Sequence, residues 1–257
     1  PSVRWVLCDF LADAAANGTA AFRLKTVDKP AEAKSPLKVE ESADAVTVTT
    51  GPLKFTVSRK SFKVFDAAWL DANGDGKFSD DEQVLAAGAK SGGVVRPGDW
   101  AEGGCKADQE HFSGTKPPDA VTILEKGPMK VTLRIEGRHY AAEGGVTNGL
   151  YGYQVYLTAW AGRPEVEVQY ALTSTMLTEI GQNTWQMNVW PIRSSEVHFD
   201  LKDAAAAQFA LLGESEQSGT VEGSAVLLQE KGAFAIKTDK AELAKGALAR
   251  GAAALSN

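Results

Sequence analysis

The most specific chemical pattern in the sequence is a run of twelve residues, DANGDGKFSDDE, which occupies positions 71–82. Acidic or amide side chains stand at its positions 1, 3 and 5, glycine at position 6 and glutamate at position 12. This spacing is that of an EF-hand calcium loop. It predicts six oxygen ligands: Asp71, Asn73, Asp75, the backbone carbonyl of Lys77, Ser79 and Glu82. Calcium prefers such an oxygen-only set, so we expect one bound Ca²⁺.

The segments beside this loop indicate which kind of calcium site it is. A sensor EF-hand requires an amphipathic helix on each side, whereas residues 62–70 alternate as a β-strand does. We therefore expect a lone calcium loop inserted in a β-domain, where the ion fixes a long connection. The alternative is a solvated turn rich in Asp, Asn and Gly. Calcium modules without a partner loop bind weakly, which favours an extracellular, secreted protein.

Composition excludes several classes of partner. The 257 residues include 27 basic and 33 acidic side chains, a net charge of −6, and no basic run. This balance argues against a nucleic acid or an anionic membrane as partner. No apolar run approaches the roughly 18 residues of a membrane span, so none is predicted. Cys8 and Cys105 are too few for a zinc cluster, and either a single bridge or a small core residue at Cys8 fits.

Short alternating segments separated by turn residues predict an all-β fold, a β-sandwich. A β-hairpin is expected over 1–27, with strands 3–10 and 19–27 joined at Asn17-Gly18, followed by a linker over 28–36. The sandwich is expected over 37–238, with an irregular stretch over 88–119, and a short C-terminal helix over 239–257. The predicted sandwich strands are 37–41, 45–50, 53–58, 62–69, 120–125, 129–140, 152–161, 164–173, 184–192, 195–201, 208–212, 221–229 and 233–238.

Aromatic residues give a second signal, because an exposed tryptophan can stack on a sugar ring while a buried one fills a core. The candidates for carbohydrate contact are Trp100, Trp185 and Trp190. The tryptophans in apolar strands, predicted to be in the core, are Trp5, Trp69 and Trp160.

Two polar constellations are weaker candidates. Arg138 and Tyr140 share one face of a predicted strand, and an arginine beside a tyrosine base would suit β-elimination from a uronic acid. A polar strand end entering a turn explains the same residues. His111 has Glu110 and Asp108 nearby and could bind a metal or another ligand.

Four stretches resemble one protein family, the exo-rhamnogalacturonan lyase and YetA-like proteins. They are SVRWVLCDF at 2–10, TGPLKF at 50–55, KGPMKV at 126–131 and YLTAWAG at 156–162. The resemblance implies secreted polysaccharide lyases with an N-terminal barrel, a central β-sandwich and a C-terminal α/α toroid, acting on pectic or related uronic-acid polymers. This chain would cover the end of the barrel and the sandwich. Without the toroid we expect it to be inactive alone, and no catalytic residue is transferred.

Taken together, the sequence predicts a secreted, calcium-binding sandwich segment of a polysaccharide-lyase-like protein, which serves as a scaffold and contacts an acidic or pectic polysaccharide. The alternative is a non-enzymatic extracellular structural or adhesive subunit. Two strands alone are marginal in water, so the pair at 1–27 would bury its surface either on the sandwich of its own chain or on a neighbouring copy. In the second case, self-association could extend into a filament.

Overall fold

The computed structural model describes residues 5, 8–28, 34–98, 109–144, 149–173, 192–202, 207–212, 216–221, 223–230, 233–238, 240–247 and 253–256. It divides into two compact units, Pro1–Asp200 and Leu201–Asn257. The predicted sandwich of 37–238 therefore spans both. Each unit is all-β among the described residues, which confirms the predicted fold class.

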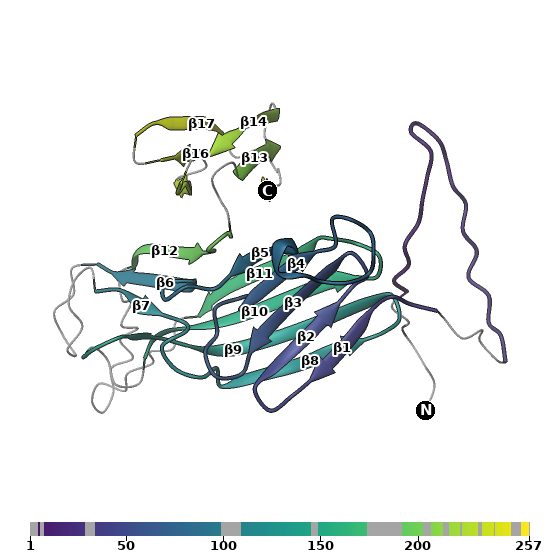
Figure 1. Cartoon of the computed structure of the whole chain (residues 1–257), viewed down its shortest axis with the longest axis horizontal. Helices are drawn as coiled ribbons and strands as arrows, with labels where there is room; N and C mark the ends of the chain where they lie inside the picture. The colour runs from purple at the N-terminus through teal and green to yellow at the C-terminus, as the bar shows by residue number, and fades with distance from the viewer. Residues whose placement is uncertain are drawn as a thin grey trace, which may run out of the picture. The chain divides into compact units, whose positions relative to one another are not determined.

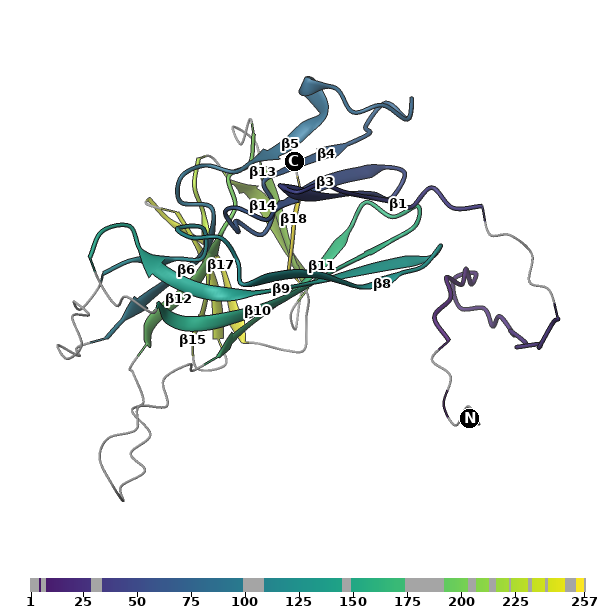
Figure 2. The same ribbon diagram turned by 90° about the horizontal axis from the view of Figure 1, so that it is seen from below.

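The first unit is a sandwich of two antiparallel sheets (Figures 1 and 2). The first sheet runs in chain order: β1 (Lys38–Glu41), β2 (Ala45–Thr49), β3 (Leu53–Ser58), β4 (Ala67–Leu70) and β5 (Gln83–Ala86). The strands of the second, in spatial order, are β11 (Val166–Thr173), β10 (Leu150–Trp160), β9 (Lys130–Ala141), β7 (His111–Phe112), β6 (Gly92–Pro97) and β12 (Ile192–His198). β8 (Ala120–Lys126) also pairs with β9.

Period-two alternation explains why these segments pack as two layers. In β9 every second residue from Val131 to His139 is fully buried or nearly so, and the residues between them are half-exposed. β3 follows the same pattern, with Phe55 facing inward. Apolar side chains of both sheets meet in one core, including Val48, Phe55, Leu133 and Leu157. Burial of one face of each sheet supplies the main stabilising term of the sandwich.

The prediction of an irregular stretch over 88–119 is wrong at β6 and β7. Two adjacent glycines concealed a buried strand, because glycine is usually read as a breaker. A Cβ at Gly93 would lie 1.9 Å from the hydroxyl oxygen of Tyr170, and one at Gly92 would lie 2.9 Å from the Cα of Lys63. Only a residue without a side chain lets β6 approach these neighbours so closely.

The strand predicted over 62–69 is only partly correct, because β4 begins at Ala67. Phe62 and Val64 are fully buried outside any strand, and Val64 has a left-handed φ of 69°. The Phe62 ring stacks on Tyr153, with ring centroids 5.1 Å apart. This segment therefore contributes core side chains, and tertiary packing decides its backbone conformation.

The hairpin predicted over 1–27 does not form: residues 8–28 contain no strand. The turn is present, since Gly18 N–H donates to the Ala15 carbonyl at 2.8 Å and Asn17 has a φ of 58°. The apolar side chains stay in solvent, however, with Phe22 58% and Leu24 78% exposed. Without a surface on which to bury that face, two strands gain too little to stay paired.

The described residues of the second unit form two three-stranded sheets and a small core. One contains β14 (Glu216–Val221), β13 (Ala207–Leu212) and β18 (Ala253–Ser256), and the other β15 (Val226–Glu230), β16 (Ala233–Lys237) and β17 (Glu242–Ala247). The C-terminal helix predicted over 239–257 is wrong, since β17 and β18 lie there. Pairing with β16 lets Ala244 pack beside Ile236, and this burial overrides the weak helical preference of an Ala-rich segment.

No helix in the described part of the chain is long and apolar enough to cross a membrane.

Candidate functional site

The predicted calcium loop is the connection of a β-hairpin, between β4 and β5 (Figure 1). These strands pair antiparallel, and Trp69 lies opposite Gln83. The two ends of the loop, Asp71 and Glu82, are therefore brought to the same place by strand pairing. In a helix–loop–helix site the flanking helices would serve that purpose. A hydrogen bond of 3.2 Å from the Ala72 N–H to Glu82 Oε1 joins the two ends of the loop.

The first half of the loop is wound around its own side-chain oxygens. Asp71 accepts hydrogen bonds from three backbone N–H groups, those of Gly74 at 2.8 Å, Asp75 at 3.1 Å and Gly76 at 2.9 Å. Asn73 Oδ1 accepts from Asp75 N–H at 2.8 Å, and Asp75 Oδ1 from Lys77 N–H at 2.8 Å. The predicted ligand oxygens at positions 1, 3 and 5 are thus fixed by the backbone. Gly74 and Gly76 make the winding feasible, with φ of 75° and 74°.

The second half is a single 3₁₀ turn over Asp80–Glu82 with a capping box. Glu82 Oε2 accepts from the Ser79 N–H at 3.1 Å and from the Ser79 hydroxyl at 2.9 Å. Glu82 is 7% exposed, which is unusual for a carboxylate in a polar loop. The side chain at position 12 is consequently oriented back toward the loop.

The loop is attached to its own sheet through an aromatic side chain at position 8. The Lys54 ammonium of β3 lies 4.2 Å from the Trp69 ring centroid and 5.4 Å from that of Phe78. Phe78 is half-buried, while residues 72–77 are exposed. Contacts to β3 and β4 therefore take the place of the second loop that sensor EF-hands pair with. Trp69, predicted to be in the core, instead lies beside Lys54 on the half-exposed side of β4.

The oxygen ligands of the loop suit calcium, but its carboxylates do not lie close enough together to coordinate one ion in this conformation. Among the described residues, no three His, Cys, Asp or Glu side chains lie close enough together to hold a metal ion. The carboxylates of Asp71 and Asp75 accept hydrogen bonds from backbone N–H groups. Asp71 Oδ1 accepts two of these bonds, whereas Asp71 Oδ2 and Asp75 Oδ1 accept one each and keep a second lone pair. Binding would draw these groups toward Glu82, across a loop that is already folded.

Some of the other residues named from the sequence lie outside the described part of the chain, and two others are exposed. The residues outside the described part are Trp100, Cys105, Asp108, Trp185 and Trp190. Cys8 is exposed with a free thiol, so it is not a core residue. Trp5 is 91% exposed, and its predicted place in the core is wrong because the expected hairpin does not form.

Arg138 and Tyr140 do share the outward face of β9, as alternation predicts. The Tyr140 ring lies under the Lys116 ammonium, 4.1 Å from it. Thr115 donates a hydrogen bond to the Tyr140 carbonyl at 2.9 Å. These contacts fix a strand end beside a turn, and the β-elimination hypothesis stays a prediction.

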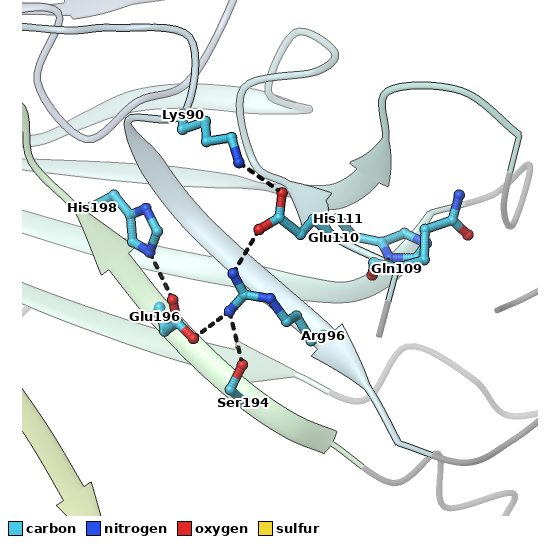
Figure 3. A network of polar contacts seen from close by, with 8 residues as sticks. All are labelled: Lys90, Arg96, Gln109, Glu110, His111, Ser194, Glu196 and His198. Atoms are coloured by element: carbon cyan, nitrogen blue, oxygen red, sulfur yellow. Dashed lines mark hydrogen bonds and ion pairs between the residues drawn. The ribbon is translucent and has the colours of Figure 1, made fainter. Parts of the chain in front are cut away.

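Sequence reasoning missed a network centred on Arg96 of β6 (Figure 3). Its guanidinium binds Glu110 Oε1 at 2.6 Å on one side and Glu196 of β12 on the other. Lys90 reaches Glu110 at 3.2 Å, and His198 Nε2 lies 2.7 Å from Glu196. The only signal in the sequence was the clustering of charges beside apolar strands.

The electrostatics of this network favour a structural role. The hydrogen bond from Arg96 lowers the pKa of the Glu110 carboxyl, with a further contribution from Lys90. Burial alone would raise the pKa of Glu196, but hydrogen bonds from His198 and Ser194 and the charge of Arg96 lower it overall. Both carboxyls are therefore ionised at neutral pH and are poor proton donors. The network ties β12 to β6 and to the start of β7.

Two histidines of the second sheet, His111 of β7 and His139 of β9, are fully buried. His139 Nδ1 lies 3.0 Å from the Tyr151 carbonyl and Nε2 lies 2.9 Å from the Tyr170 hydroxyl, so both ring nitrogens are occupied. His111 Nδ1 lies 2.9 Å from the Gln109 carbonyl, while its Nε2 is buried without a hydrogen-bond partner among the described residues. Burial lowers the pKa of His111, and lowers that of His139 to about 4. Both rings are neutral core residues, and the role of His111 as a ligand stays a prediction.

Comparison with known proteins gives no family. No protein-family model matches the chain, and no curated protein matches its sequence.

Proposed function

We propose that this chain is a calcium-binding β-sandwich that acts as a scaffold within an extracellular, polysaccharide-lyase-like protein. The observation that carries the proposal is the folded state of the 71–82 loop. Four of its predicted ligand side chains, those of Asp71, Asn73, Asp75 and Glu82, already accept hydrogen bonds from the loop backbone. Part of the entropic cost of forming a calcium site is therefore met before the ion arrives.

The position of the loop explains what calcium would do for the protein. Asp71, Asp75 and Glu82 bring three negative charges to one hairpin connection, and these charges repel one another until a cation is bound. An ion that binds the folded loop but not the unfolded chain stabilises the fold by mass action, by about 2.7 kcal/mol at a concentration one hundred times Kd. Calcium would thus hold β4 and β5 together at the edge of the first sheet.

Calorimetry on chelator-treated protein tests this proposal directly. Titration with CaCl₂ should show one site, and Ca²⁺ should raise the melting temperature. Glu82→Gln should weaken binding more than the control Ser79→Ala, because a bidentate carboxylate supplies two of about seven oxygens. Mg²⁺ should bind less well, since it requires a compact octahedral site. The absence of both calcium heat and any chelator effect on melting would refute the proposal.

A second function, self-association, is favoured by the exposed N-terminal segment. Residues 8–28 contain no strand and present apolar side chains to solvent, among them Phe10, Phe22 and Leu24. β11 pairs with β10 on one side and with no other described strand on its second side. Strand addition between copies would bury the apolar side chains and satisfy the open backbone groups together.

Deletion of residues 1–27 distinguishes self-association from packing of the N-terminal segment on its own chain. A shortened protein that stays folded but loses a concentration-dependent oligomer in light scattering supports strand exchange. A full-length protein that remains monomeric at high concentration with calcium present excludes it.

A further inference from the structure

The outward face of β9 and β10 carries an ordered set of polar and aromatic side chains. On β10 the half-exposed residues from Gln154 to Trp160 alternate with the buried positions of the core. Register places Tyr156 opposite Arg134 and Gln154 opposite Glu136, so the four side chains form two adjacent cross-strand pairs. An outward sheet face normally needs no such order, because water satisfies its polar groups.

Two hydrogen bonds and one ion pair join these four residues into one group. The Tyr156 hydroxyl donates to Gln154 Oε1 at 3.1 Å, and Gln154 Nε2 donates to Glu136 Oε1 at 2.8 Å. Glu136 Oε2 is ion-paired with Arg134 Nε at 3.2 Å. Because the Tyr156 hydroxyl reaches a side chain two residues away on its own strand, its ring must lie along the strand. The Tyr156 side chain is half-exposed on this outward face.

A second aromatic residue stands on the same face, four positions along β10. Strand geometry separates Tyr156 and Trp160 by about 13 Å. Between them lies the pair Thr132 and Thr158, whose hydroxyl oxygens are 3.4 Å apart. These side chains are short, so the surface is lower between the two aromatic residues than at either end. Trp160 also lines a cavity, together with Asp9, Phe10, Leu11, Met129 and Lys130.

The charges on this face are balanced by carboxylates. Lys130 is ion-paired with Asp9 at 2.6 Å and with Glu125 at 3.0 Å, and Arg134 with Glu136. An acidic polymer would have to displace these carboxylates from their cations. A neutral polyol could instead hydrogen-bond to the amide, carboxylate and hydroxyl groups, while its C–H faces pack on the aromatic rings.

We propose that the face of β9 and β10 from the cavity at Trp160 to Tyr156 binds a neutral, extended oligosaccharide. The separation of the two rings requires a chain longer than a disaccharide. This inference goes beyond the proposed function, which assigns the sandwich only the role of a scaffold. It does not involve the calcium loop, which belongs to the other sheet, and it names a neutral polymer where the sequence suggested a pectic one.

The test is titration of the full chain, in calcium buffer, with cellohexaose, xylohexaose, mannohexaose and hexagalacturonate, followed by calorimetry and tryptophan fluorescence. At least one neutral hexasaccharide should bind. Trp160→Ala and Tyr156→Ala should each weaken that binding at least tenfold, in line with the loss of an aromatic anchor. Tyr156→Phe keeps the ring and should bind within about threefold of the wild type. Trp5→Ala, which removes an exposed tryptophan that lies on neither β9 nor β10, is the control and should leave the affinity unchanged.

Circular dichroism and melting temperature identify a variant that fails to fold, and the other aromatic variant then decides the question. Three results would overturn the inference: no neutral hexasaccharide binds, only hexagalacturonate binds, or both alanine variants bind like the wild type. Calcium binding measured on the same samples distinguishes this failure from failure of the calcium proposal.

Discussion

Acidification should destabilise the first unit through His139, a perturbation whose size follows from the structure. The His139 ring is fully buried. Its Nε2 accepts a hydrogen bond from the Tyr170 hydroxyl, and its Nδ1–H donates one to the Tyr151 carbonyl. Burial is the largest cause of the fall of the His139 pKa from 6.5 to about 4, and the charge of protonated His111 makes a smaller contribution to the same shift. Between these two pH values the unfolded chain binds a proton that the folded chain does not.

Stability should therefore fall as the pH is lowered through this window, and this contribution should level off below about pH 4. Each pKa unit corresponds to about 1.4 kcal/mol, so the loss due to His139 is about 3 kcal/mol. Glu110 acts in the same direction but at lower pH, because its carboxyl has a lowered pKa and loses stabilisation only as it becomes protonated.

Urea unfolding of wild type and His139→Gln at several pH values between 7 and 4, followed by tryptophan fluorescence, measures the effect. Glutamine can donate to the Tyr151 carbonyl and accept from Tyr170 but does not titrate. The variant should be less stable at pH 7, and its stability should depend less on pH. Parallel profiles for the two proteins would refute the reasoning, because His139 would then titrate alike in the folded and unfolded chains.

Further predictions concern packing and charge. Gly93→Ala should destabilise the fold by more than about 1 kcal/mol in urea melts, since its Cβ would lie 1.9 Å from the Tyr170 hydroxyl; wild-type stability would contradict the close approach. Phe55→Ala should cost about 3–5 kcal/mol of unfolding free energy, because the ring is 1% exposed in the main core. Arg96→Met should cost about 1–3 kcal/mol and should increase hydrogen exchange in β6 and β12, because two carboxylates lose the cation between them. Unchanged exchange would show that the network does not join these strands.

The sequence alone determined the β class and most sandwich strands, because period-two alternation is a local property that the sheet preserves. It also determined the calcium-loop pattern, since ligand spacing and the glycine at position 76 are written in twelve consecutive residues. That calcium binds there stays a prediction. Trp160 was predicted to lie in the core because its strand is apolar, but it is half-exposed. Strand alternation could have placed it on the outward face, since it is an even number of residues from Gln154 and Tyr156.

Only the tertiary structure decided the remainder. β6 was not predicted because it contains two adjacent glycines. These glycines allow the strand to lie close to Tyr170 and Lys63, and only the tertiary structure shows that contact. The C-terminal segment has helical composition, but pairing with β16 buries Ala244, and a short isolated helix has no comparable gain. The Arg96 network joins residues about 100 positions apart, and the two buried histidines acquire their lowered pKa from strands that pack around them. Such effects depend on which segments meet in space, and local spacing carries no record of that.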